Sequence, residues 1–266
     1  MHEHVAEFIK RMITRMTFVE IMPTLEKWGF LSDRDLRSLT LQQMKESVAI
    51  KVVNLCEGKK TTMDDAADLD IVYNKARSNK KNWCVYQMSE PSDSEMNLAD
   101  VSEFKVNLKK FVSSGLKNVT VHFREFGDSL WIRIAWGNDR MPPNQYRPTF
   151  VVYHIQTPYA FITGLTKHHR PELAQALLLA TGYRQIQEMQ LKSRCLESLI
   201  DIVFKRFTQP FQSYQPRAPP EKSSAPAGVD PEASPETIKE KQQVHQAMLE
   251  TFGDGPLPKL QYATYQ

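Results

Sequence analysis

Hydrophobic residues recur every three or four positions through the first 77 residues. The clearest case is residues 3–16, where charged residues occupy one side and the other side is apolar. The apolar stripe consists of Val5, Phe8, Ile9, Met12 and Met16. This spacing is typical of an amphipathic α-helix. The same period continues over residues 18–28 and predicts a second helix that ends at Gly29, because glycine is a common helix stop.

Capping residues divide the rest of this stretch. Ser32 and Asp35 have the spacing of a capping box and predict a short helix. Thr40 is expected to cap the next helix, which closes at Gly58, and Thr62 to cap a helix over residues 63–76. About five short helices in so few residues suggest a compact antiparallel bundle of the death-fold kind. The assignment to the death-fold kind rests on analogy with known folds.

The hydrophobic period changes to two after residue 117, which predicts β-strands. The predicted strands are residues 118–126, 130–136, 149–155 and 159–165, and residues 184–191 are a candidate fifth strand. Gly127 and Asp128 form the turn of a hairpin between the first two. Four consecutive strands in a meander-like order predict an antiparallel sheet that needs cover on one face.

Helical patterns on both sides of the meander supply that cover. The predicted helices are residues 101–117, 171–181 and 193–207. Residues 83–88 are an apolar segment expected to dock onto this part, and residues 89–100 are polar and predict a loop. The pattern therefore predicts the α+β class, with an all-α bundle at 1–77 and an α+β domain at 78–210 whose antiparallel sheet is flanked by helices.

The composition shifts after Phe207 to a segment rich in Pro, Ser and Ala. Such a segment buries too little apolar surface to fold by itself, so we expect a linker and polar tail at 211–266. A polar helix is predicted over residues 235–252. The chain has a net charge of +3, and because this tail is acidic, the folded part is more basic than the whole. A moderate positive charge permits a nucleic-acid partner without requiring one.

Three cysteines lie far apart and form no paired or metal-type spacing. This predicts buried, reduced thiols in the cytosol or nucleus. Residues 3–16 are charged every few positions and no long apolar run occurs, so we expect neither a signal peptide nor a membrane span.

Motifs of catalysis are missing from the sequence. No dinucleotide-binding, phosphate-loop, serine-hydrolase or zinc-enzyme motif occurs, so we predict no enzyme, no cofactor and no metal site. His122 and His154 have no nucleophile or metal-ligand set near them in sequence, and His168-His169 lies in a basic loop. Four aspartates at positions 64, 65, 68 and 70 are interpreted as acids at the positive end of a helix dipole. Phe123, Trp131 and Trp136 are interpreted as core.

The charged side of residues 3–16 allows two interpretations. Glu3 and Glu7 precede Lys10, Arg11 and Arg15, an order that suits the helix dipole, and Glu7 and Arg11 have the spacing of an ordinary ion pair. The alternative is a binding face. Further bases are scattered along the chain at Lys45, Lys80, Lys81, Lys105, Lys109, Lys110, Lys117, Arg147, Lys167, Arg170 and Arg194. These bases either are spread over a solvated surface or share one face that contacts the phosphates of a nucleic acid. Their spacing in the sequence does not decide between these two interpretations.

Several strings carry a resemblance to a known family. These are VAEFIKR at residue 5, FLS at 30, KESV at 45, LKNVTVHFRE at 116, WIRIAWG at 131, NQYRPTFVVY at 144, QTPYAF at 156 and ETFGD at 250. Over its whole length the chain resembles the vertebrate centromere protein N (CENP-N) family. The resemblance implies a pyrin-type death-fold domain at 1–77, followed at 78–210 by the domain shared with centromere protein L.

The resemblance also implies a function. Family members are non-enzymatic kinetochore proteins of the nucleus that read the centromeric nucleosome containing the histone variant CENP-A, in kinetochore assembly and chromosome segregation. Glu3 and Glu7 match the glutamates that meet the histone's Arg-Gly loop. A pair of carboxylates one helical turn apart suits the forked donors of an arginine. The positions matching the DNA-contacting residues are Lys10, Arg11, Arg15, Lys45, Lys81, Tyr146, Arg147, Lys167, Arg170 and Arg194.

The sequence departs from the family at some positions. Gln42 and Met44 stand where the family has arginines beside Lys45, so that patch is expected to be weaker. Implied partners include centromere protein L and other proteins of the constitutive centromere network. The family continues past Gln266 with a segment that pairs with centromere protein L, so heterodimer formation is in doubt for this shortened chain. The alternative function is a protein-interaction adaptor acting through both domains without binding DNA.

Overall fold

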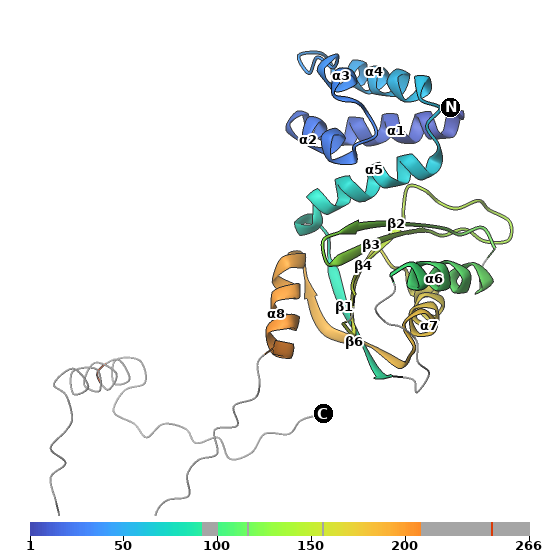
Figure 1. Cartoon of the computed structure of the whole chain (residues 1–266), viewed down its shortest axis with the longest axis vertical. Coiled ribbons are helices and arrows are strands. Elements are labelled where there is room, and N and C mark those ends of the chain that lie inside the picture. The colour runs from blue at the N-terminus through green and yellow to red at the C-terminus, as the bar shows by residue number, and fades with distance from the viewer. Residues whose placement is uncertain (92–100, 116, 156, 209–245, 247–266) are drawn as a thin grey trace, which may run out of the picture. The chain divides into compact units, whose positions relative to one another are not determined.

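The computed structural model describes residues 1–91, 101–115, 117–155, 157–208 and 246 (Figure 1). Helices and a six-stranded antiparallel sheet make up these residues, so the predicted α+β class is confirmed. Met1–Phe211 form one compact unit. The predicted tail at 211–266, with its polar helix at 235–252, lies outside the described residues apart from Gln246. The division into domains at 1–77 and 78–210 stays a prediction.

Five helices form the N-terminal part. They are α1 (Glu3–Arg15), α2 (Phe18–Trp28), α3 (Asp33–Arg37), α4 (Lys45–Gly58) and α5 (Met63–Ala76). The apolar stripe of α1 is buried in a core shared with α2, α4 and α5. Gly29 ends α2 at a φ of 73°, a conformation that glycine adopts without strain.

Two of the three predicted helix caps are confirmed. Ser32 and Thr62 each form a capping box with the aspartate three residues later, Asp35 and Asp65 respectively. The prediction for Thr40 is wrong, because α4 begins at Lys45 with Met44 as its N-cap residue. The residues after Thr40 form a turn instead, and Leu41 in that turn packs against the core of the bundle.

The sheet has the strand order β2-β3-β4-β5-β1-β6, in which all neighbours are antiparallel. The strands are β1 (Trp83–Pro91), β2 (Thr120–Phe126), β3 (Ser129–Ala135), β4 (Thr149–His154), β5 (Tyr159–Thr163) and β6 (Tyr183–Ser193). The predicted meander of four strands and the candidate fifth strand are therefore present.

The apolar segment at 83–88 is an inner strand and not a docking segment. β1 lies between β5 and β6, and it extends to Pro91 into the stretch predicted as a loop. Trp83, Val85, Tyr86 and Met88 are all buried, so side chains on both faces of the strand are covered. A strand covered on both faces loses the alternation by which strands are recognised, which explains the error.

Helices cover both faces of the sheet, whereas cover on one face was predicted. On one face α6 (Val101–Gly115) and α7 (Arg170–Thr181) enclose a core with residues such as Ile132 and Val151. On the other face α8 (Leu196–Thr208) and Ile71 of α5 pack against Trp131 and Phe150. Figure 1 shows α6 and α7 together on one side of the sheet, with α8 on the other. The buried positions of Trp131 and Trp136, with Phe123 packed against the core, confirm their interpretation as core.

The helical bundle is joined to the sheet through α5. Arg133 of β3 is fully buried, and its Nε lies 2.6 Å from Oδ2 of Asp70 on α5. Arg124 of β2 lies 3.4 Å from Asp68. The interpretation of the aspartates by the helix dipole therefore does not hold for Asp68 and Asp70, which lie in the second turn of α5 and pair with arginines of the sheet.

Candidate nucleic-acid interface

Cations of α1 and of the segment before β1 meet in a narrow groove beside α1. The groove has a volume of about 90 Å³ and is lined by Arg11 and Arg15 of α1, Lys81 after the short helix η1 (Ser78–Lys80) and Tyr146 of the loop between β3 and β4. The amphipathic pattern of α1 explains one wall, because its apolar stripe is buried and its cations remain outside. Residues far apart in sequence therefore form one surface.

Tyr146 brings the loop between β3 and β4 into contact with α1. The guanidinium carbon of Arg11 lies 4.5 Å from the centroid of the Tyr146 ring, and the ring of Phe8 lies 5.7 Å from it. A cation at this distance over an aromatic face is attracted by about 0.5–1 kcal/mol at an exposed site. Tyr146 remains 39% exposed, so both partners are accessible at the surface.

A buried hydrogen-bond network holds the loop that carries Tyr146 and Arg147. The guanidinium of Arg133 donates to the side-chain oxygen of Gln145 at 2.8 Å and to its backbone oxygen at 2.7 Å. The same guanidinium binds Asp70, and the Gln145 amide donates to the Thr120 hydroxyl at 3.2 Å. Because Gln145 precedes Tyr146, the network fixes the position of the groove's sheet wall relative to the bundle.

Lys81 forms the inner wall of the groove. Its ammonium lies 4.6 Å from the centroid of the Phe150 ring, and burial lowers the pKa of this lysine. The next residue, Asn82, accepts a hydrogen bond of 3.4 Å from Nε of Arg194, which follows the end of β6. Arg194 is exposed and therefore extends the basic surface past Lys81.

Lys45 extends the surface in the other direction. Its ammonium donates to the backbone oxygen of Thr14 at 3.4 Å, beside Arg15, and lies 5.7 Å from the Phe18 ring. Gln42 and Met44 are both exposed near the start of α4. Lys45 is thus the cation that the start of α4 contributes, next to the C-terminal end of α1.

Glu3 and Glu7 lie in a wider cleft at the other end of α1. This cleft has a volume of about 830 Å³, and its lining includes both glutamates, Lys10 and Tyr146. Both glutamates are exposed, and neither is in an ion pair with any residue that the structure describes. The expected pair of Glu7 with Arg11 is therefore wrong, because Arg11 lies over Tyr146 instead. Two carboxylates are left available beside a row of cations.

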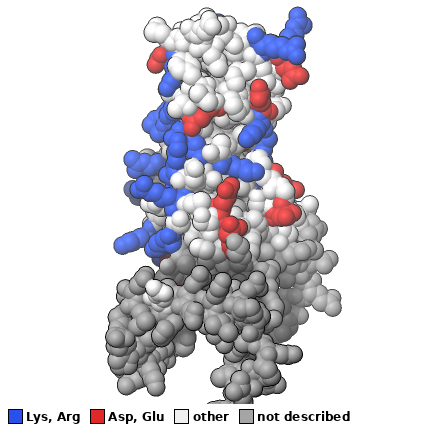
Figure 2. Space-filling model, turned by 90° about the vertical axis from the view of Figure 1, so that its left-hand side faces the viewer, with Lys and Arg blue, Asp and Glu red and all other residues white. Residues whose placement is uncertain are grey.

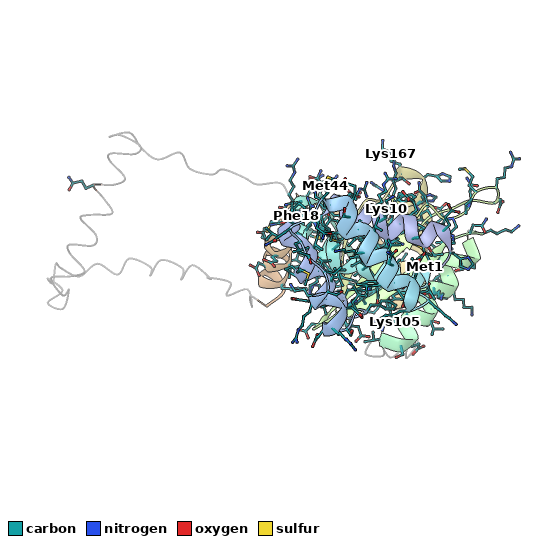
Figure 3. The ribbon with its side chains drawn as sticks, turned by 90° about the horizontal axis from the view of Figure 1, so that it is seen from above. Met1, Lys10, Phe18, Met44, Lys105 and Lys167 are labelled. Carbon is teal, nitrogen blue, oxygen red and sulfur yellow. The ribbon has the colours of Figure 1, made fainter. Side chains whose placement is uncertain are left out.

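The loop after β5 brings Lys167 to the same side. His169 of η2 (Lys167–His169) stacks on Trp136 with ring centroids 4.5 Å apart, and the Trp136 indole donates to the Thr149 hydroxyl at 2.7 Å. Lys167 is exposed. In the view from above, Lys10 and Lys167 lie on the same side of the unit and Lys105 of α6 lies on the opposite side (Figure 3).

Arg170 differs from the other candidate residues. Its guanidinium forms an ion pair of 2.6 Å with Glu188 of β6, and the same carboxylate binds Lys192 at 3.0 Å. Arg170 would have to leave this pair, or share it, to contact a phosphate. Arg147 is exposed next to Tyr146.

Lys and Arg side chains gather in a band along one edge of the face drawn in Figure 2, and most of the acidic side chains in that view lie away from the edge. Such a band can follow the phosphates of a nucleic acid without reading its bases.

The described residues offer little for other chemistry. No group of three metal-ligating side chains occurs among them, and none of their helices is long and apolar enough to cross a bilayer. Burial lowers the pKa of His122 and of His154. All three cysteines are free, and Cys56 is buried as expected, whereas Cys84 and Cys195 are partly exposed.

Sequence analysis missed three residues of this surface. Asn82 and Gln145 carry no charge, and their contacts with Arg194 and Arg133 join residues 112 and 12 positions apart. Ile50 lines the cleft of Glu3 and Glu7 and is 49% exposed. Only Ile50 left a signal in the sequence, because it is an apolar residue outside the inward-facing stripe of Val48 and Val52.

The chain is similar in sequence to known centromere proteins. Residues 3–266 match the sequence profile of the family described as Centromere protein Chl4/mis15/CENP-N. Centromere protein N of Xenopus tropicalis is 56% identical over 266 residues, which are all of this chain and 76% of the relative. Centromere protein N of Homo sapiens is 43% identical over 270 residues, covering all of this chain and 80% of the relative. Centromere protein N of Gallus gallus is 41% identical over 268 residues.

Proposed function

Because the chain belongs to the Centromere protein Chl4/mis15/CENP-N family, we propose that it is a non-enzymatic reader of the CENP-A nucleosome. The family is one of centromere proteins and not a known family of enzymes, which assigns the chain to the centromere and kinetochore of the nucleus. In this proposal Glu3 and Glu7 select the histone variant through its Arg-Gly loop, and the basic surface binds nucleosomal DNA.

One observation carries the proposal. Glu3 and Glu7, which form no ion pair with any described residue, share a cleft with Lys10 and Tyr146, and Tyr146 contacts Arg11 in the adjoining basic groove. An arginine of a histone loop would find its carboxylate partners in the cleft while DNA beside that loop passes over the cations. Charge-assisted hydrogen bonds are worth about 1.5–3 kcal/mol each, which is enough for selectivity. Most of the affinity would come from DNA and would fall steeply with salt.

The proposal extends to the organisation of the chain and to its partners. The five helices of the N-terminal part form the pyrin-type domain at 1–77, and the sheet part is the domain shared with centromere protein L. Centromere protein L and other proteins of the centromere network are the proposed partners in kinetochore assembly and chromosome segregation. The DNA-binding set is Lys10, Arg11, Arg15, Lys45, Lys81, Tyr146, Arg147, Lys167 and Arg194, with Arg170 only if it is released from Glu188.

Glu7→Ala tests the selectivity element. We expect the preference for CENP-A nucleosomes over H3 nucleosomes to fall by roughly 10- to 150-fold, which corresponds to the loss of one charge-assisted hydrogen bond. The measurement is a direct titration of both nucleosomes at one salt concentration. Glu26→Ala is the matched control, because Glu26 is also an exposed helical glutamate with no ion pair among the described residues. A preference that survives Glu7→Ala would remove this role from the residue.

Lys45→Ala tests the DNA contacts separately. We expect weaker binding to both nucleosomes alike and a smaller slope of log affinity against log salt, by about one counterion. An effect confined to the CENP-A nucleosome would contradict the assignment of Lys45 to DNA. A chain that associates with proteins but has no affinity for DNA would instead support the adaptor function.

A further inference from the structure

A second basic pocket lies on the other side of α5, away from the groove that Arg15 and Lys81 line. Its volume is about 670 Å³, and its walls come from the end of α2, the end of α5, η1, the β2–β3 hairpin and the start of α8. Lys27, Lys75 and Arg124 supply its positive charge. The proposed nucleosome contacts use none of these three residues.

Two of the three cations are not neutralised. Lys27 and Lys75 have no ion-pair partner among the described residues. Burial lowers the pKa of Lys75, and the neighbouring charges of Lys27 and Arg124 lower it further. Like charges held close together in a recess repel one another, and an anion in the recess would relieve that repulsion.

Arg124 is already engaged and fixes the shape of the pocket. Its guanidinium donates to the backbone oxygen of Lys27 at 2.7 Å and of Trp28 at 3.3 Å, and it lies 3.4 Å from Asp68. It therefore holds the end of α2 against β2, which positions the Lys27 side of the pocket. Lys27 and Lys75 remain as the cations that can bind a ligand.

The pocket also has an apolar side. The Lys75 ammonium lies 3.7 Å from the centroid of the Phe126 ring, and Val72 and Leu196 complete the lining. Cys195 precedes α8 and Leu196 begins it, and the dipole of this helix favours an anion at its N-terminal end. Glu197 of the same turn also lines the pocket and opposes an anion. The carboxylate of Glu125, another lining residue, is bound by Lys105.

We propose that this pocket binds an acidic peptide segment, with a carboxylate or phosphate on Lys27 and Lys75 and an adjacent apolar side chain against Phe126 and Leu196. The presence of Phe126 and Leu196 beside Lys27 and Lys75 favours a peptide over DNA, because the backbone of duplex DNA offers phosphates but no apolar side chains. A recess, moreover, accepts a side chain more readily than the outer edge of a duplex.

The test measures binding of a fluorescein-labelled peptide of sequence ELEELE to the whole chain by anisotropy. A phosphoserine version of the peptide and inorganic phosphate identify which anion is preferred, and the peptide KLKKLK is the control of opposite charge. We expect Lys27→Ala/Lys75→Ala to weaken binding of the acidic peptide at least about tenfold. Lys110→Ala is the matched control, because its ammonium also lies near an aromatic ring, 5.9 Å from the centroid of Phe111 on α6.

Two further measurements separate the proposal from a loss of folding. Glu197→Gln removes the opposing charge and should strengthen peptide binding roughly two- to fivefold, a gain that damage to the fold would not produce. Cys195 is a partly exposed thiol whose pKa is lowered by a hydrogen bond from the Ser198 hydroxyl, so it should react readily with N-ethylmaleimide. Bound peptide should slow that reaction, as followed by mass spectrometry.

The proposal is overturned if ELEELE gives no anisotropy change up to about 1 mM, or if the double variant binds it as well as the unchanged chain does. Protection of Cys195 by a short DNA duplex but not by the acidic peptide would assign the pocket to nucleic acid and would also overturn the proposal. None of these measurements uses a nucleosome. The proposed nucleosome function can therefore fail while the peptide-binding proposal stands, and the peptide-binding proposal can fail while the nucleosome function stands.

Discussion

Asp70→Ala should be the most damaging single substitution at the junction of the bundle and the sheet. The Arg133 side chain is 0% exposed and that of Asp70 is 12% exposed, and their atoms lie 2.6 Å apart. Removing the carboxylate leaves the Nε–H of Arg133 without its acceptor, and the Asn74 amide keeps only its hydrogen bond to the backbone oxygen of residue 70. Breaking a buried pair by removing one partner costs about 3–5 kcal/mol. Gln145 still accepts two hydrogen bonds from the guanidinium, so we expect the lower end, about 3 kcal/mol.

Urea and thermal unfolding followed by circular dichroism measure this cost. For a folded unit of 150–250 residues, 1 kcal/mol shifts the Tm by about 2–4 °C, so Asp70→Ala should lower it by roughly 6–12 °C. Asp68→Ala is the matched control, since its side chain is 42% exposed and its pair with Arg124 is longer, at 3.4 Å. An exposed pair is worth at most about 1 kcal/mol. Equal Tm values for the two variants would refute the reasoning.

Replacing both partners separates stability from the geometry of the surface. Asp70→Leu/Arg133→Met leaves no buried charge unpaired, and such replacements are often neutral or stabilising. We therefore expect the double variant to recover most of the stability that Asp70→Ala loses. The loop of Tyr146 would nevertheless lose its anchor at Gln145, so DNA affinity should stay reduced. Recovery of both properties together would show that the network only stabilises the fold.

Three smaller effects follow from other contacts. Tyr146→Ala should weaken DNA binding about two- to fivefold in a filter-binding titration, because the contact with Arg11 is lost, whereas Tyr146→Phe keeps the ring and should bind unchanged. Burial lowers the pKa of His154 below its ordinary value of 6.5. Because the unfolded chain then binds the proton more readily, the free energy of unfolding should fall as the pH drops below about 6.5, and by less in His154→Phe. Thr62→Ala removes a capping hydrogen bond and should cost about 1 kcal/mol in urea unfolding, whereas Thr40→Ala should change it by less than about 0.5 kcal/mol.

Local patterns predicted most elements of this fold. The stripe of α1, the capping boxes at Ser32 and Thr62 and the alternation of β2 all act within a few residues, so sequence alone reveals them. β1 was missed as a strand because burial on both faces removes the period of two. Its partners are also remote, since Cys84 pairs with Ile162 on one side and with Lys192 on the other. Such pairing depends on the whole sheet and leaves no short-range signal.

The sequence predicted which cations belong to the candidate surface, but it did not predict the groove that they line. The cations were identified one by one, whereas the groove exists only because Arg133 brings the Gln145 loop against α1 and α5. In the sequence, Arg133 is one position within the predicted strand 130–136, and nothing marks it as a buried anchor. Conversely, Arg170 matched the family pattern, yet its ion pair with Glu188 became visible only when β6 was placed beside β1.

The position of β1 between β5 and β6 also bears on the synthesis of the chain. In the β2–β5 meander each strand pairs with the next one along the chain, so it can form soon after residue 163 has left the ribosome. β1 emerges earlier, but its two pairing partners emerge later. The first is β5 and the second is β6, which ends at Ser193. Pairing of such remote segments is slow compared with local hairpins. During that interval the apolar β1 and the open edge of β5 are exposed, and such exposed edges invite pairing with other chains. The nascent chain is therefore expected to need a chaperone most between the emergence of β5 and the emergence of β6.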